Sequence, residues 1–130
     1  MSSTFRHRVR YHETDAQTLM FNSRYLELAD VAMTEFIRNL GWTYAQFVAD
    51  GADPSVVRAE VDFKGAVRFD DVLELETACT RVGTSSFRLR TEFRRDADVV
   101  AVTDLVYVNV DPRTGTSAPL PAKVAEALRG

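Results

Sequence analysis

The segment Tyr25–Leu40 constrains the fold of this chain more than any other part of the sequence. Its polar residues Glu27, Asp30, Thr34 and Arg38 recur every three or four positions. On a helix that spacing places them in one narrow stripe, and nearly every other residue of the segment is apolar. A helix that is apolar around most of its circumference must be largely buried. The remaining chain is therefore expected to wrap around it.

Residue types at both ends of this segment predict where the helix begins and ends. Asn22 and Ser23 are favourable N-cap residues, because their side chains can accept hydrogen bonds from unpaired backbone amides. Gly41 suits the residue that follows a helix. Trp42–Val48 is expected to form a short second helix, and Ala122–Arg129 a third.

The other regular segments have the alternation of apolar and polar residues that is typical of half-buried strands. Short turns rich in Gly, Asp and Pro separate the last four of them, which predicts antiparallel neighbours. The longest run is rich in valine and is expected to be central in the sheet. The predicted strands are Phe5–Tyr11, Val57–Lys64, Leu73–Thr77, Phe87–Arg94 and Val99–Val110.

The order of these elements predicts an α+β fold. One strand is followed by the long helix and then by four strands, so only that helix is large enough to cover the apolar face of the sheet. The simplest arrangement is a curved, five-stranded antiparallel sheet wrapped around one central helix. The length of 130 residues fits a single domain, residues 1–130.

Composition excludes several classes of protein. The net charge of -3 argues against a dedicated nucleic-acid binder. No stretch approaches the roughly 20 apolar residues of a membrane span, and residues 1–6 lack the apolar run of a signal peptide. The single cysteine, Cys79, cannot form an internal disulfide and fits a reducing compartment. A cytoplasmic protein that binds neither nucleic acid nor membrane is expected.

Several kinds of catalytic site are also excluded by the residue pattern. Cys79 has no histidine or other base at a recognisable spacing, and no serine lies in a Gly-x-Ser-x-Gly turn. No group of histidine, cysteine and carboxylate residues has the spacing of metal ligands, so no metal is expected. His7 is predicted to be a half-buried strand residue, whereas His12, Glu13 and Glu35 are predicted to face solvent.

Two neighbouring motifs point to a known family. The first is Val9–Ala16, which reads VRYHETDA, and the second is Phe21–Tyr25, which reads FNSRY and opens the long helix. Together they resemble the hotdog-fold thioesterases, in particular the 4-hydroxybenzoyl-CoA thioesterases and their short acyl-CoA thioesterase relatives. The resemblance covers nearly the whole chain and implies the same sheet around a central helix.

The resemblance also implies a set of catalytic positions. Asp15 matches the catalytic carboxylate of the family, which acts as nucleophile or general base. Asn22 matches the position whose backbone N–H contacts the thioester carbonyl oxygen, and Tyr11 matches an aromatic position near some active sites. The residues alone allow other roles, because Asp15 could form only an Asx-turn, Asn22 only an N-cap, and Tyr11 only a packing contact.

Three departures from the family pattern affect these expectations. Thr18 stands where many relatives have glycine, Asn22 stands where some have histidine, and Gly83–Ser85 replaces a segment that is basic in some members and contacts the CoA nucleotide. Arg88 and Arg90 could supply the missing phosphate contacts. The alternative is that both lie on a solvated face of the sheet.

The implied function is hydrolysis of an acyl-CoA or aryl-CoA thioester, with coenzyme A as part of the substrate and no other cofactor. The substrate pocket is expected to contain Met20, Phe21, Tyr25 and Phe63. One alternative is a non-catalytic domain that binds acyl thioesters. Another is a hotdog dehydratase, although the histidine that those enzymes use at the helix start is absent. The resemblance further implies a homodimer or homotetramer.

Overall fold

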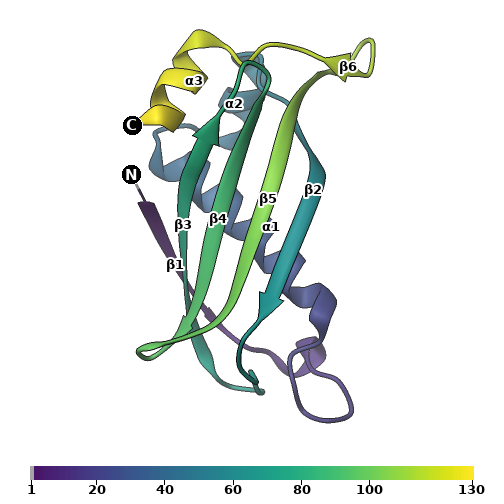
Figure 1. The fold of residues 1–130 in the computed structure, drawn as a ribbon, viewed down its shortest axis with the longest axis vertical. Coiled ribbons are helices and arrows are strands. Elements are labelled where there is room, and N and C mark those ends of the chain that lie inside the picture. Colours follow the sequence, from purple (N-terminus) through teal and green to yellow (C-terminus); the bar gives the residue numbers. More distant parts are fainter. Residues whose placement is uncertain (1) are drawn as a thin grey trace.

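A curled sheet wraps around helix α1 in the computed structural model, which describes residues 2–130 (Figure 1). The strands are β1 (Ser2–Arg8), β2 (Pro54–Phe63), β3 (Val72–Val82), β4 (Ser86–Arg95), β5 (Asp98–Asp111) and β6 (Thr116–Ser117). The helices are a 3-10 turn η1 (Tyr11–Glu13), α1 (Asn22–Asn39), α2 (Tyr44–Ala49) and α3 (Ala122–Arg129). The predicted antiparallel sheet around a long helix is confirmed.

All neighbouring strands in the sheet are antiparallel, in the order β1-β3-β4-β5-β2, and the short β6 pairs with β5. The strands β3, β4 and β5 follow one another through tight turns, as their sequence predicts. The long connection through α1 separates β1 from β2, and these two strands form the opposite edges of the sheet (Figure 1).

Helix α1 buries its broad apolar face against the sheet. The buried residues are Tyr25, Leu28, Ala29, Ala32, Met33, Phe36 and Ile37. The helix is less completely covered than expected, because Leu26 and Val31 remain 38% and 43% exposed.

A row of hydroxyl groups crosses the buried face of the sheet. Ser3 pairs with Thr77, Thr77 with Thr91, and Thr91 with Thr103, and all four residues are buried. The Oγ1 atoms of Thr77 and Thr91 lie 2.8 Å apart and share a hydrogen bond. This buried polar pair lies within the sheet, on strands β3 and β4.

Three expected boundaries and exposures are corrected by the structure. The first strand ends at Arg8 rather than Tyr11, because Tyr11–Glu13 closes a 3-10 turn. Helix α1 begins at Asn22, and its N-cap is Phe21 rather than Asn22 or Ser23. Strand β2 was expected to bury one face, yet most of it is exposed, and it lies at the edge of the sheet.

Among residues 2–130, no helix is both long enough and apolar enough to span a membrane.

Candidate active site

The loop that carries Asp15 is closed by hydrogen bonds of Asp15 itself. The Asp15 amide donates to the Leu19 carbonyl at 2.9 Å, and the Thr18 amide donates to the Asp15 carbonyl at 3.0 Å. Asp15 Oδ1 accepts from the amides of Gln17 at 2.8 Å and Leu19 at 3.3 Å. Asp15 therefore does form the Asx-turn that its residue type allows. Its second oxygen, Oδ2, has no hydrogen bond to any described residue and remains available for chemistry.

Thr18 gives this loop its tight curvature. Its φ of 64° lies in the left-handed region, which β-branched residues rarely adopt. Contacts with a distant segment hold it there: the Phe69 amide approaches the Thr18 carbonyl at 3.4 Å, and Arg68 Nη1 lies 3.4 Å from Thr18 Oγ1. The position that is glycine in many relatives therefore has a backbone conformation that favours glycine.

The amino end of α1 presents free hydrogen-bond donors beside this loop. Phe21 is the N-cap and provides no side-chain hydrogen bond, and the first turn contains no acidic residue. Within the part of the chain that the structure describes, neither the Asn22 nor the Ser23 amide has an acceptor. Such amides, together with the positive end of the helix dipole, favour a negatively charged oxygen.

Asp15 and the start of α1 line the same cleft, which has a volume of about 360 Å³. We refer to it as the Asp15 cleft. Its lining residues are Asp15, Leu19, Met20, Phe21, Asn22, Tyr25, Phe63, Gly65, Ala66 and Val67. The structure thus brings together six of the predicted site residues. They are Asp15, Asn22, Met20, Phe21, Tyr25 and Phe63.

Aromatic rings form one wall of the Asp15 cleft. The ring of Tyr25 packs edge-on against Phe63, with centroids 5.0 Å apart, and lies 5.5 Å from the ring of Phe93. Tyr25 is almost completely buried, and this burial raises the pKa of its phenol, while the nearby Arg95 acts in the opposite direction. Tyr25 thus stays neutral, and it can offer apolar surface and a hydroxyl group to a ligand.

The sequence did not reveal the part of the lining that comes from residues 65–67. These residues lie about fifty positions after Asp15 and belong to no regular element, so no local pattern marks them. A β-carbon on Gly65 would lie 3.3 Å from Val100 Cγ1, which leaves little room for a side chain at that position. The close approach of this segment to β5 becomes apparent only in the three-dimensional structure.

Three predicted site residues lie outside the Asp15 cleft. Tyr11 is 80% exposed and packs edge-on against Phe69, with ring centroids 6.0 Å apart. Arg88 and Arg90 lie 4.0 Å and 3.5 Å from the carboxylate of Asp104 on the neighbouring strand β5. Roles for Tyr11 in catalysis and for the two arginines in CoA binding stay predictions.

Glu13 differs most from its predicted environment. It was expected to face solvent, but only 7% of it is exposed, and His7 is buried to the same extent. His7 Nε2 lies 2.8 Å from Glu13 Oε1. Burial raises the pKa of the Glu13 carboxyl, but hydrogen bonds from the Arg10 amide and His7, with the nearby imidazoles, outweigh it and lower the pKa overall. His12 is exposed, as expected.

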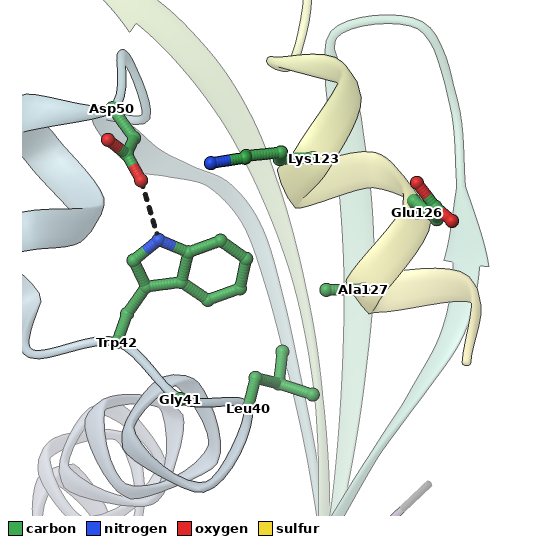
Figure 2. Close-up of a pocket in the computed structure, with 7 residues that line it drawn as sticks. All are labelled: Leu40, Gly41, Trp42, Asp50, Lys123, Glu126 and Ala127. Atoms are coloured by element: carbon green, nitrogen blue, oxygen red, sulfur yellow. Dashed lines mark hydrogen bonds between the residues drawn. The ribbon is translucent and has the colours of Figure 1, made fainter.

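A second cleft, of about 460 Å³, lies at the other end of the molecule, between the end of α1 and helix α3 (Figure 2). Trp42 Nε1 donates a hydrogen bond to Asp50 Oδ2 at 2.8 Å, and Lys123 extends toward this pair. One oxygen of the Asp50 carboxylate is thus bonded to the indole. Lys123 and Glu126 make the lining of this larger cleft more charged, so it is a poorer candidate for an apolar ligand than the Asp15 cleft.

No group of three or more histidine, cysteine or carboxylate residues is placed so that it could hold a metal ion within residues 2–130.

Comparisons with known proteins identify the family of this chain. The family model described as "Thioesterase-like superfamily" matches residues 9–128. A putative esterase of Aquifex aeolicus is 26% identical over 99% of both chains. The acyl-CoA thioesterase YbgC of Haemophilus influenzae is 26% identical over 93% of this chain and 90% of its own. A solved gentisyl-coenzyme A thioesterase superposes with a TM-score of 0.87 at 24% identity, covering 97% of this chain and 99% of the other. The chain therefore belongs to the thioesterase-like superfamily and has its hotdog fold.

Proposed function

We propose that this protein hydrolyses an acyl-CoA or aryl-CoA thioester in the Asp15 cleft. One observation carries the proposal: Asp15, which has a carboxylate oxygen without a hydrogen bond, and Asn22, at a helix terminus with free amides, line the same, largely apolar cleft. A thioester needs an apolar place for its acyl group, donors for its carbonyl oxygen, and a base or nucleophile for its carbonyl carbon.

The amides of Asn22 and Ser23 would act on the carbonyl oxygen. Attack on a thioester moves negative charge onto this oxygen, and amides already aimed at it stabilise that charge without reorganisation. Each such donor contributes about 3–4 kcal/mol to transition-state stabilisation in enzymes where one donor has been removed. The Asn22 side chain is not required for this role, because the donor belongs to the backbone.

Asp15 Oδ2 would act in one of two ways. As a general base, it takes a proton from water while the water oxygen attacks the carbonyl carbon; the C–S bond then breaks and the CoA thiolate leaves. As a nucleophile, Oδ2 attacks the carbon itself, the thiolate leaves, and water hydrolyses the resulting mixed anhydride. Single turnover in ¹⁸O-labelled water detects the nucleophilic route when water attacks the Asp15 carbon of the anhydride, because only then does the label enter Asp15.

The lining of the cleft suggests the acyl group. Met20, Phe21, Tyr25 and Phe63 offer apolar and aromatic surface. Aromatic and medium-chain acyl groups both fit this description. The names of two similar proteins, an acyl-CoA thioesterase and a gentisyl-coenzyme A thioesterase, support an acyl-CoA or an aryl-CoA as the substrate.

The proposed test is a screen of the purified protein against acyl-CoAs of graded chain length and against aryl-CoAs, with released thiol as the readout. Turnover of at least one series, lost in Asp15→Asn, is the expected result. A non-catalytic binding domain would instead bind these thioesters and release no thiol. That result would reject hydrolysis and favour the binding alternative.

We also propose that the protein assembles as a homodimer through strand β2, or as a homotetramer of such dimers. β2 is an edge strand whose Val56 and Val57 are 48% and 60% exposed, and exposed edges of this kind tend to pair. Antiparallel pairing of two copies about Ala59 would place Arg58 of each copy opposite Glu60 of the other. The pairing is therefore complementary in charge as well as in backbone hydrogen bonds.

A further inference from the structure

The Glu13 carboxylate connects two segments of the chain inside the protein. Its Oε1 accepts a hydrogen bond from the Arg10 amide at 2.7 Å and lies 2.8 Å from His7 Nε2, on strand β1. A carboxylate can only accept, so the His7 ring carries the proton on Nε2. Through this one oxygen, Glu13 links strand β1 to the η1 turn. Glu13 itself lies two residues before Asp15.

The backbone of the same residue connects a third segment. The Glu13 carbonyl accepts a hydrogen bond from the Phe21 amide at 2.9 Å, and Thr14 forms an isolated β-bridge with Met20. Phe21 is the N-cap of α1, so this bond fixes the residue directly before the free amides of Asn22 and Ser23. The loop that carries Asp15 starts after Glu13 and Thr14. It ends at Met20 and Phe21, which pair with these two residues.

A structural role alone does not require a carboxylate at this position. Removing an ionised group from water is costly, and well-packed apolar residues can replace a buried charged pair with little loss of stability, or with a gain. What an apolar pair cannot do is fix the η1 turn against β1 through directed hydrogen bonds. The carboxylate of Glu13 therefore supplies, beside the Asp15 loop, a directed connection that apolar packing could not supply.

We infer that Glu13, held by His7, is a positioning residue that fixes the Asp15 carboxylate relative to the amino end of α1. The inference rests on the proposed hydrolysis at Asp15. Both groups must act on one carbonyl: Asp15 on the carbon, the helix amides on the oxygen. A displacement of about 1 Å between such groups can reduce turnover by roughly 10²-fold. Glu13 acts through Asp15 and has no contact with the substrate in this scheme.

Three substitutions at one position separate hydrogen bonding from packing. Glu13→Leu keeps the volume and removes both hydrogen bonds, and we expect kcat to fall roughly 10- to 100-fold with KM changed by less than about threefold. Glu13→Ala should show at least the same loss. Glu13→Gln keeps an acceptor for the Arg10 amide and should retain kcat within about threefold. His7→Phe leaves one of the two bonds and should give an intermediate value.

Thr77→Val provides a matched control, because it removes a buried hydrogen bond between strands that carry no cleft residue. Its kcat should remain unchanged even where its stability falls. Amide hydrogen exchange supplies a second readout: the Leu19 amide, which is bonded to Asp15 Oδ1, should exchange faster in Glu13→Leu and not in Thr77→Val.

The outcomes distinguish this inference from the proposed function. A folded Glu13→Leu variant with normal kcat and unchanged exchange at Leu19 would overturn the positioning role, as would a loss of kcat that Thr77→Val shares. If Asp15→Asn is active, the proposed function fails instead. Even then, faster exchange of the Leu19 amide in Glu13→Leu would support the inference that Glu13 fixes the Asp15 loop.

Discussion

Asp15 and Leu19 are joined by two hydrogen bonds: the amide of Asp15 donates to the carbonyl of Leu19, and the amide of Leu19 donates to the carboxylate of Asp15. This pair closes the loop and directs one carboxylate oxygen inward. The other oxygen stays free at the cleft. The same side chain therefore builds the loop and, in the proposed reaction, would also supply the reactive group, so substitution can separate the two roles.

The substitution Asp15→Asn tests the reactive role while retaining the loop. The amide oxygen of asparagine can still accept from Gln17 and Leu19, so we expect a folded protein. The charge and the basic oxygen are lost, so kcat should fall roughly 10²–10⁴-fold, with a smaller effect on KM. Steady-state kinetics and circular dichroism check both statements. Normal kcat in a folded variant would remove Asp15 from the mechanism.

Asn22→Ala tests whether the side chain or the backbone amide at position 22 acts on the substrate. The donor at this position belongs to the backbone, and the Asn22 side chain makes no hydrogen bond to a described residue. We expect kcat to change by less than about threefold, far less than in Asp15→Asn. A loss as large as that of Asp15→Asn would show that the side chain, rather than the amide, acts on the substrate.

The left-handed backbone of Thr18 predicts that Thr18→Gly is stabilising. A residue with a β-carbon costs about 1–2 kcal/mol in this conformation, and the greater entropy of glycine in the unfolded chain offsets part of the gain. The net increase in the free energy of unfolding should be roughly 0.5–1 kcal/mol, as measured by urea denaturation. Thr84→Gly, at an exposed turn position without positive φ, should be neutral or destabilising. A less stable Thr18→Gly would mean that the Arg68 contact outweighs the strain.

The lowered pKa of Glu13 predicts a dependence of stability on acid pH. Its carboxylate favours the folded state at pH values above its ordinary pKa of 4.5. This contribution is lost as the pH falls through the lower pKa of the folded protein, because the unfolded chain binds the proton first. Urea unfolding at pH 7 and at about pH 4 should therefore show a smaller acid loss in Glu13→Gln than in the natural protein. Parallel losses would contradict a stabilising role for the ionised group.

Because β2 is an exposed edge strand, adding a charged side chain to it should change the mass of the assembly. Light scattering at micromolar concentration should give at least twice the chain mass of 14.6 kDa. Val57→Lys should shift the mass toward the monomer, since a lysine at an exposed edge opposes strand pairing. Val48→Lys, on α2 and similarly exposed at 42%, is the control and should leave the mass unchanged. A monomeric natural protein would reject the proposed assembly.

The sequence by itself determined the elements of this protein and most residues of one site. Its helical and alternating periods are local, and so are its turn residues, which is why α1 and the strands β3 to β5 could be located from them. Asp15 and Asn22 are separated by a single short loop, so their convergence at the start of α1 followed from the chain path. Phe63 was predicted as a pocket residue from the family resemblance rather than from any local pattern.

The tertiary structure alone decided the environment of Glu13, the exposure of β2 and the contribution of residues 65–67 to the cleft. Glu13 stands among polar neighbours and is buried only because His7 and Phe21 close over it from other segments. β2 alternates like a half-buried strand, yet its place at the edge of the sheet leaves it uncovered. Burial depends on which distant segments come to lie nearby, and a local pattern of residues does not contain that information.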